Sequence, residues 1–191
     1  LDLVDMDNTK DEDINYEVFY LDKLIDELIE LHMPAGVSKG IKIKTKLDYQ
    51  LPLCVNGDRA KLYRIILNLF SNAIKFTDDG FVETEIKLLE KKSNQAHYQF
   101  KISDSGIGIP LELQPYVFER FYRAHPSYKG VFKGHGLGLH IAKKYVELMG
   151  GELKLSSIPN EGTTFYFDIW MDMAEEPMQT MTDISKPKSK L

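Results

Sequence analysis

Polar side chains recur every three or four residues within the segment 58–77: Arg64, Asn68, Asn72 and Lys75. At about 100° per residue, this spacing places them along one line of a helix. Asparagine is unfavourable inside a helix because its side chain competes for backbone hydrogen bonds. Two asparagines one turn apart, followed by a lysine, therefore indicate side chains kept for a ligand. A solvated helix face is the alternative for each of them taken alone.

The same segment carries a continuous apolar stripe on another side of the helix, made of Leu62, Ile65, Ile66, Leu69, Phe70 and Ala73. This spacing predicts a helix that packs one face on the core. Gly57 turns the chain before the helix, and Asp58 is placed to cap its first turn. The polar line is therefore carried by a helix that the core holds in place.

Asp104 is the second candidate for chemistry. A strand predicted over 97–104 places Tyr98, Phe100, Ile102 and Asp104 on one face. Because this face carries three large apolar side chains, it is the buried one, so Asp104 points inward at the end of the strand. A buried carboxylate needs hydrogen-bond donors, and the neighbouring sequence supplies none.

Two glycine-spaced loops complete the candidate site: Ser105–Pro110 (SGIGIP) and Gly134–Leu139 (GHGLGL). The second opens a helix predicted over 139–149, and backbone N–H groups at a helix N-terminus bind phosphate. It is not a dinucleotide fingerprint, because leucine stands at 139 where that motif has glycine. The sequence also lacks the Gly-Lys-Ser/Thr of the P-loop.

Hydrophobic periodicity predicts the elements that position these side chains. Besides the helices over 58–77 and 139–149, a helix is expected over 19–31, ended by Pro34 and Gly36. Strands are expected at 40–48, 51–55, 81–89, 97–104, 152–158 and 163–170. Such one-sided strands predict a mixed, mostly antiparallel sheet with helices on one face. The expected fold class is α+β, a two-layer α/β sandwich.

Two further segments connect these elements. Residues 111–121 have helical tendencies that Pro115 interrupts, and residues 123–134 lack an apolar period. A connection of this length, broken by glycine and proline, predicts a mobile lid over the site.

Composition limits the class of protein. The 191 residues are 43% hydrophobic and 28% charged, which fits one globular domain with tails. A net charge of −5 argues against a nucleic-acid-binding surface. No apolar run reaches the roughly 18 residues of a membrane span, so no membrane contact is expected. The single cysteine, Cys54, lies between apolar neighbours, which predicts a buried residue and a reducing, cytoplasmic compartment.

Five segments then occur in a distinctive order: NLFSNAIKFT, DSGIGIP, FERFYR, GHGLGL and EGTTF. Their order and spacing resemble the asparagine, glycine and phenylalanine boxes of the ATP-binding catalytic domain of two-component sensor histidine kinases. The resemblance spans about residues 19–170. It implies a Bergerat-type ATP-binding fold. It also implies that the domain binds Mg-ATP and transfers the γ-phosphoryl group to a histidine on a separate helical domain.

The resemblance also implies roles at the phosphate end. Asn72 would coordinate Mg²⁺, for which an amide oxygen is a suitable hard ligand, and Asn68 would support it or contact the nucleotide. Lys75 and Arg123 would pair with phosphate oxygens and carry the catalytic charge stabilisation.

At the base end, Asp104 would accept the adenine amino group and Phe76 would pack on the ring. His135 departs from the small or polar residue common in the family. The other implied nucleotide-binding residues are Gly106, Ile107, Gly108, Tyr122, Gly134, His135, Gly136, Leu137, Gly138, Leu139 and Thr163.

The sequence lacks the family's phosphoacceptor motif, since His32 is not followed by an acidic residue. Residues 1–16 are expected to end an upstream dimerisation and phosphoacceptor helix, 17–173 to form the catalytic domain and 174–191 to be a polar tail or linker. The implied partners are ATP, that upstream domain and a response-regulator receiver domain. Membrane anchoring of the full-length protein is left open.

Two other functions compete with this interpretation. One is a nucleotide-binding regulatory or scaffolding module without kinase activity. The other is an ATPase of the chaperone or topoisomerase type, which by resemblance would need a glutamate where Asn68 stands.

Overall fold

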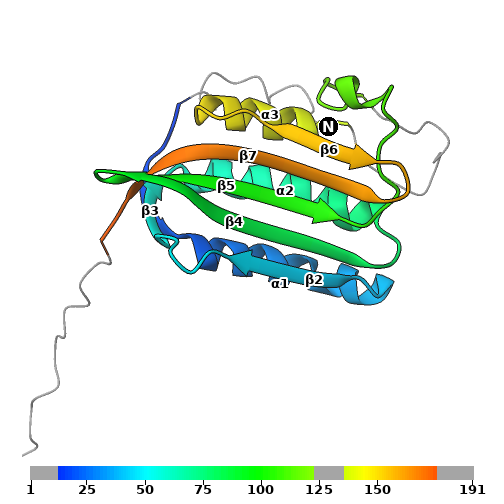
Figure 1. Cartoon of the computed structure of the whole chain (residues 1–191), viewed down its shortest axis with the longest axis horizontal. Coiled ribbons are helices and arrows are strands. Elements are labelled where there is room, and N and C mark those ends of the chain that lie inside the picture. Colours follow the sequence, from blue (N-terminus) through cyan, green and yellow to red (C-terminus); the bar gives the residue numbers. More distant parts are fainter. Residues whose placement is uncertain (1–12, 123–135, 176–191) are drawn as a thin grey trace, which may run out of the picture.

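A computed structural model describes residues 13–122 and 136–175. In this part of the chain, seven strands form one sheet and three α-helices lie against it (Figure 1). The helices are α1 (Leu21–Lys39), α2 (Arg59–Phe76) and α3 (Gly138–Leu148). The strands are β1 (Glu17–Tyr20), β2 (Lys42–Leu47), β3 (Cys54–Gly57), β4 (Phe81–Lys92), β5 (Gln95–Asp104), β6 (Lys154–Ile158) and β7 (Gly162–Met173).

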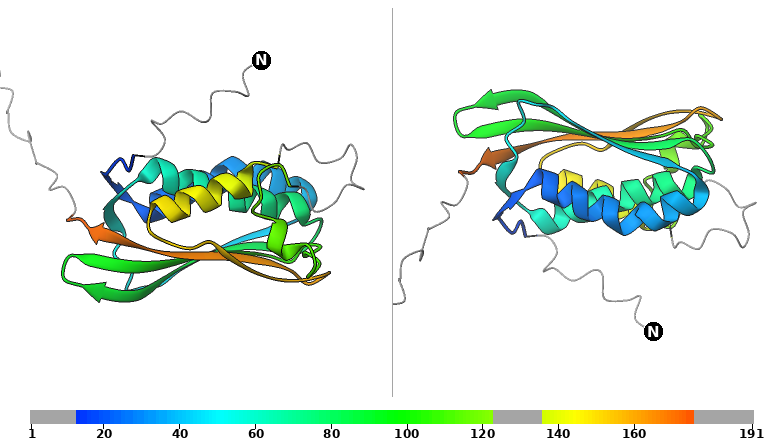
Figure 2. Two further views of the ribbon diagram at one scale, coloured as in Figure 1. Left: turned by 90° about the horizontal axis from the view of Figure 1, so that it is seen from above. Right: turned by 90° about the horizontal axis from the view of Figure 1, so that it is seen from below.

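The sheet is mixed, as predicted. Its order is β1-β3-β7-β5-β4-β2, with β6 paired to one end of β7, and the β2–β4 pair is parallel while the other pairs are antiparallel. All three helices cover the same face, which produces two layers (Figure 2). The predicted α+β sandwich is therefore confirmed.

Helix α2 runs along the middle of the helical layer and holds the core. Each residue of its predicted apolar stripe is buried: Leu62, Ile65, Ile66, Leu69, Phe70 and Ala73. Across the interface the sheet presents the stacked rings of Phe100 and Phe167, 5.0 Å apart. Asp58 caps the helix as predicted, because its side chain accepts the Lys61 N–H at 2.8 Å.

The prediction for α1 was wrong at both ends. Phe19 belongs to β1, and the helix continues through Pro34 and Gly36 to Lys39. The loss of one backbone hydrogen bond at proline is offset by tertiary contacts, since Gly36 packs against Ile43. The helix ends instead at Gly40, whose left-handed backbone (φ 72°) is a common helix stop.

Two smaller predictions also need correction. The face of β2 expected to be half-buried is covered only at its start, because Ile41 is buried whereas Thr45 and Leu47 are exposed at the sheet edge. The helical tendency of 111–121 amounts to one short 3-10 helix, η2, over Gln114–Tyr116.

Cys54 is buried, as predicted. None of the helices among the described residues is both long and apolar enough to cross a membrane.

Candidate functional site

Asp104 ends β5 and points into the space between the layers, as its parity predicted, with only 9% of its surface exposed. The expectation that nearby sequence supplies no donor was wrong. Its Oδ1 accepts the backbone N–H of Gly106 at 2.9 Å and that of Thr163 at 3.3 Å. The chain bends just after the strand, and this bend brings the Gly106 N–H to the carboxylate.

Burial raises the pKa of Asp104 above its ordinary value, because removal from water disfavours the charged form. The N–H groups of Gly106 and Thr163 lower the pKa but do not cancel the burial effect. Neither hydrogen bond ends on Oδ2. This second oxygen is thus suited to accept a donor from a ligand.

The first glycine loop, SGIGIP, is fixed to the end of α2. The Ile107 N–H donates to the Phe76 carbonyl at 3.2 Å. A Cβ on Gly106 would collide with the same carbonyl, so only glycine allows the loop this close to α2. These contacts bring Phe76, Asp104 and the loop together.

The hairpin between β6 and β7 supports the other side of this loop. Its Asn160 N–H donates to the Ile107 carbonyl at 2.8 Å, and Ser157 Oγ accepts the Ile109 N–H at 2.8 Å. Gln114 Nε2 donates to the carbonyls of Ile109 and Ser157 at 2.9 and 3.0 Å.

These supporting residues are not among those predicted from the sequence. A signal for one of them existed, because Ser157 follows Leu153 and Leu155 at the same parity in a predicted strand. The alternation of side chains along a strand, which predicts that Asp104 points inward, also places Ser157 on the face of Leu153 and Leu155.

Two residues of the polar line of α2, Asn68 and Arg64, contact α3. A Cβ added to Gly138 would lie 3.0 Å from Asn68 Oδ1, so the two residues are in contact. Lys75 Nζ lies over the Phe76 ring at 4.8 Å. Arg64, by contrast, donates to the Tyr145 hydroxyl on α3 at 3.1 Å, which gives it a structural partner.

The start of α3 lies against α2 at Asn68. Its first i to i−4 bond is Ile141 N–H to the Leu137 carbonyl, at 2.9 Å, so the N–H groups just before it have no partner within the helix. Gly136 accepts the Phe121 N–H at 3.1 Å, which joins the phenylalanine-box segment to the second glycine segment next to Tyr122. Leu137, Gly138 and Leu139 thus lie at the start of α3, and their role in nucleotide binding stays a prediction.

Several predicted residues lie outside the described part of the chain: Arg123, Gly134 and His135. The predicted lid over 123–134 lies there as well.

The described residues contain no group of three His, Cys, Asp or Glu side chains that could hold a metal ion. The expected metal ligand, Asn72, would offer one amide oxygen. Mg²⁺ fits such a site because it keeps several waters and is commonly held through phosphates.

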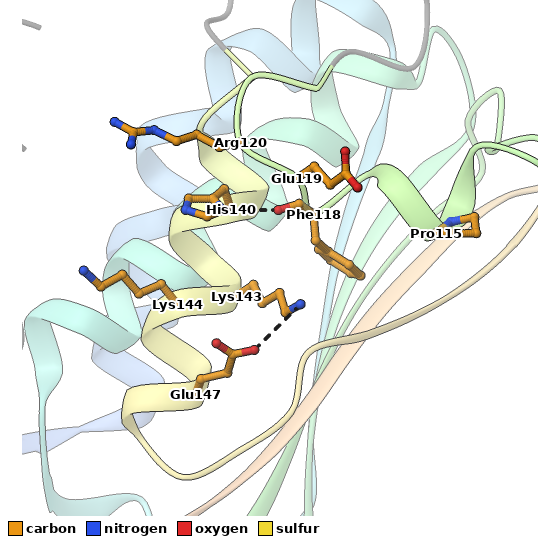
Figure 3. A pocket seen from close by; sticks show the side chains of 8 residues that line it. All are labelled: Pro115, Phe118, Glu119, Arg120, His140, Lys143, Lys144 and Glu147. Carbon is orange, nitrogen blue, oxygen red and sulfur yellow. Dashed lines mark hydrogen bonds and ion pairs between the residues drawn. The ribbon is translucent and has the colours of Figure 1, made fainter. Parts of the chain in front are cut away.

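A hollow of about 500 Å³ lies beside this region, between the segment 115–120 and α3 (Figure 3). His140 Nδ1 hydrogen-bonds the Phe118 carbonyl across it at 3.3 Å, and the Lys143–Glu147 pair lies along its wall. Its lining residues are Pro115, Phe118, Glu119, Arg120, His140, Lys143, Lys144 and Glu147. None of the predicted site residues is among them.

Comparisons with known proteins agree with the geometry. The family described as "Histidine kinase-, DNA gyrase B-, and HSP90-like ATPase" matches residues 57–173. The hybrid signal transduction protein dokA of Dictyostelium discoideum is 38% identical over 158 residues, covering 80% of this chain and 10% of that protein. The signal transduction histidine-protein kinase BarA of Escherichia coli K12 is 36% identical over 155 residues, covering 81% of this chain and 17% of that protein. This chain thus spans less than a fifth of the length of these curated relatives.

Two solved structures show the same fold. Full-length ShkA in complex with AMPPNP superposes with a TM-score of 0.72 at 26% identity, covering 87% of this chain and 33% of that one. The catalytic domain of histidine kinase ThkA superposes with a TM-score of 0.63 at 27% identity, covering 81% of this chain and 97% of that one. The second match spans nearly the whole of that catalytic domain.

The fold and the site define an ATP-binding domain of the two-layer α+β class. The chain belongs to the histidine kinase-, DNA gyrase B- and HSP90-like ATPase family, and within it to the catalytic domains of sensor histidine kinases.

Proposed function

We propose that this domain binds Mg-ATP through the residues described above and transfers the γ-phosphoryl group to a histidine on a separate helical domain. Asp104 carries the proposal. Its Oδ1 is held by Gly106 and Thr163, which leaves Oδ2 to accept the adenine amino group. Guanine carries a carbonyl there, so the same carboxylate selects against it.

The phosphate end of the site is proposed at the polar line of α2 and the start of α3. The contact between Asn68 and Gly138 supports this, because it brings the amide side chain to the N–H groups that open α3. Asn72 would hold Mg²⁺ through its amide oxygen, and Lys75 and Arg123 would bind phosphate oxygens. When bound, the metal neutralises charge on the β- and γ-phosphates.

Phosphoryl transfer needs mainly positioning and charge stabilisation. The bond between the γ-phosphorus and the bridging oxygen breaks, a phosphorus–nitrogen bond to the histidine forms, and ADP is released. The imidazole proton passes to a carboxylate that, by resemblance, lies beside the phosphoacceptor histidine. We therefore propose that the upstream helical domain completes the active site, and that a receiver domain takes the phosphoryl group afterwards, in the cytoplasm.

Transfer of labelled phosphate tests this proposal. The domain is joined again to its upstream helical region and incubated with ATP labelled at the γ-position. We expect acid-labile label on the helical region, and much less with the Asp104→Ala variant. ATP binding without any transfer would instead support a regulatory nucleotide-binding module, and absence of ATP binding would contradict the proposal altogether.

A further inference from the structure

The last turn of α2 is held by a side chain from another helix. A helix leaves its final carbonyl groups without intrahelical partners. Lys39 Nζ donates to three carbonyls at this end of α2: Ile74 at 2.9 Å, Lys75 at 3.1 Å and Thr77 at 2.9 Å. The Phe76 carbonyl between them accepts the Ile107 N–H of the first glycine loop instead.

Lys39 is suited to this contact by its chemistry and its place in the chain. An ammonium group has three N–H donors, and a positive charge is favourable at a helix C-terminus. The residue is the last of α1, directly before the helix stop at Gly40. Its side chain is only 31% exposed, while its carboxylate neighbour Asp78 is 84% exposed and 3.7 Å away, so the carbonyls are the closer partners.

The turn that Lys39 holds is the one that carries the base end of the proposed site. Phe76, which is proposed to pack on the base, belongs to it, and its carbonyl is the contact between α2 and the loop beside Asp104. Thr77, the residue at the C-terminal cap of α2, gives this turn no side-chain cap. Its Oγ1 is buried and has no hydrogen-bond partner among the described residues.

We propose that Lys39 is a positioning residue for nucleotide binding. It acts through the last turn of α2, fixing the Phe76 backbone against the first glycine loop and thereby the base-binding carboxylate. This inference rests on the proposed function, since it assumes that the nucleotide binds at this turn.

The test compares two variants that each remove one link between α1 and α2. Lys39→Met keeps the aliphatic stem and removes the donors. Arg59→Met is the matched control, because Arg59 pairs with both oxygens of Glu27 on α1, at 2.7 and 2.6 Å, at the opposite end of α2. ATP affinity is measured by calorimetry at a temperature where circular dichroism shows both variants folded, together with the amide chemical shifts of Gly106 and Ile107 without nucleotide.

We expect Lys39→Met to weaken ATP binding on the order of tenfold, a loss of about 1.4 kcal/mol, and to shift both amides, while Arg59→Met leaves both unchanged. Unchanged affinity of Lys39→Met, or an equal loss in the two variants, would overturn the inference and leave the proposed function intact. Wild-type protein that fails to bind ATP would overturn both. Should Lys39→Met not fold, Lys39→Gln, with a shorter and neutral side chain, is judged by the same criteria.

Discussion

At the residue scale, the proposed site depends on the carboxylate of Asp104. Backbone N–H groups hold its Oδ1 in place, and neither of these hydrogen bonds ends on Oδ2, the oxygen proposed to accept the adenine amino group. A side chain fixed in this way binds with less loss of conformational entropy than a mobile one. The raised pKa of Asp104 is a further sign of a functional site, since perturbed pKa values gather at such sites.

Replacing Asp104 with alanine should weaken ATP binding by about 1.5 to 3 kcal/mol, because a charge-assisted hydrogen bond is lost. GTP binding should fall much less, since guanine never made that bond. Competition calorimetry with both nucleotides measures the difference. Asp168→Ala is a suitable control, because Asp168 contacts His97 at 2.7 Å on the uncovered face of the sheet. Equal losses for ATP and GTP would remove Asp104 from the base-binding role.

Asn72 should act through the metal. We expect Asn72→Ala to lose most of the Mg²⁺-dependent part of ATP affinity and to keep its fold, because the residue lies off the buried stripe of α2. Titrations of ATP with and without Mg²⁺ provide the measurement. Ser71→Ala is the neighbouring control, since the Ser71 hydroxyl is hydrogen-bonded to His32 Nε2 on α1 at 2.9 Å. A variant with an unchanged Mg²⁺ dependence would show that the metal binds elsewhere.

At the scale of elements, α2 is anchored at both ends by charged groups. Its C-terminal turn is held by Lys39, and its N-terminus carries a buried ion pair between Asp58 and Lys61, at 3.0 Å. The two residues are only 1% and 5% exposed. Asp58 also accepts the Asn15 N–H, and Lys61 donates to the Asp13 carbonyl, so this pair ties the chain that enters the domain to α2.

Asp58→Ala should lower the free energy of unfolding by roughly 3 to 5 kcal/mol, because it removes a helix cap and leaves the Lys61 ammonium buried without its carboxylate. Asp26→Ala, at an exposed position of α1, should change it little. Urea unfolding of both variants gives the comparison. A loss below about 1 kcal/mol would mean that the pair contributes no more than an ordinary cap.

The Asp58 carboxylate also makes the stability of the fold depend on pH. Burial alone would raise the pKa of Asp58, but hydrogen bonds from Asn15 and Lys61 and the Lys61 charge outweigh it and lower the pKa. A carboxylate with a lowered folded pKa stabilises the fold fully above about pH 4, its ordinary pKa. This contribution is lost as the pH falls further, so the acid loss of stability should be smaller in Asp58→Ala than in the wild type.

At the scale of the whole molecule, the site and the described chain ends lie at opposite ends of the sheet. Asp104 ends β5 at one end, whereas β1 and the end of β7 both pair with β3 at the other (Figure 1). The proposed base-binding carboxylate therefore lies at the end of the sheet away from residues 13 and 175.

Because ATP binds only the folded domain, it should raise the melting temperature. At about 100 times its Kd, a ligand stabilises by about 2.7 kcal/mol, or about 5 to 10 °C for a domain of this size. Differential scanning calorimetry with Mg-ATP measures the shift, with GTP as the weaker ligand and Asp104→Ala as the variant that should lose most of it. An unshifted wild-type transition would contradict nucleotide binding.

The sequence by itself determined the features that depend only on residue spacing within one helix or strand. The stripe of α2, the inward parity of Asp104 and the cap at Asp58 follow from helical and strand periodicity, and the motif order indicated the family. These signals need only a few neighbouring residues, because side-chain direction is fixed by the backbone within one element.

The tertiary structure alone decided how those elements are held. Lys39 meets carbonyls 35 to 38 residues away, Asn68 meets Gly138, and α1 continues through Pro34 because its last turns are packed against β2 and α2. Local periodicity does not predict such contacts. They follow from which elements become neighbours when the sheet assembles.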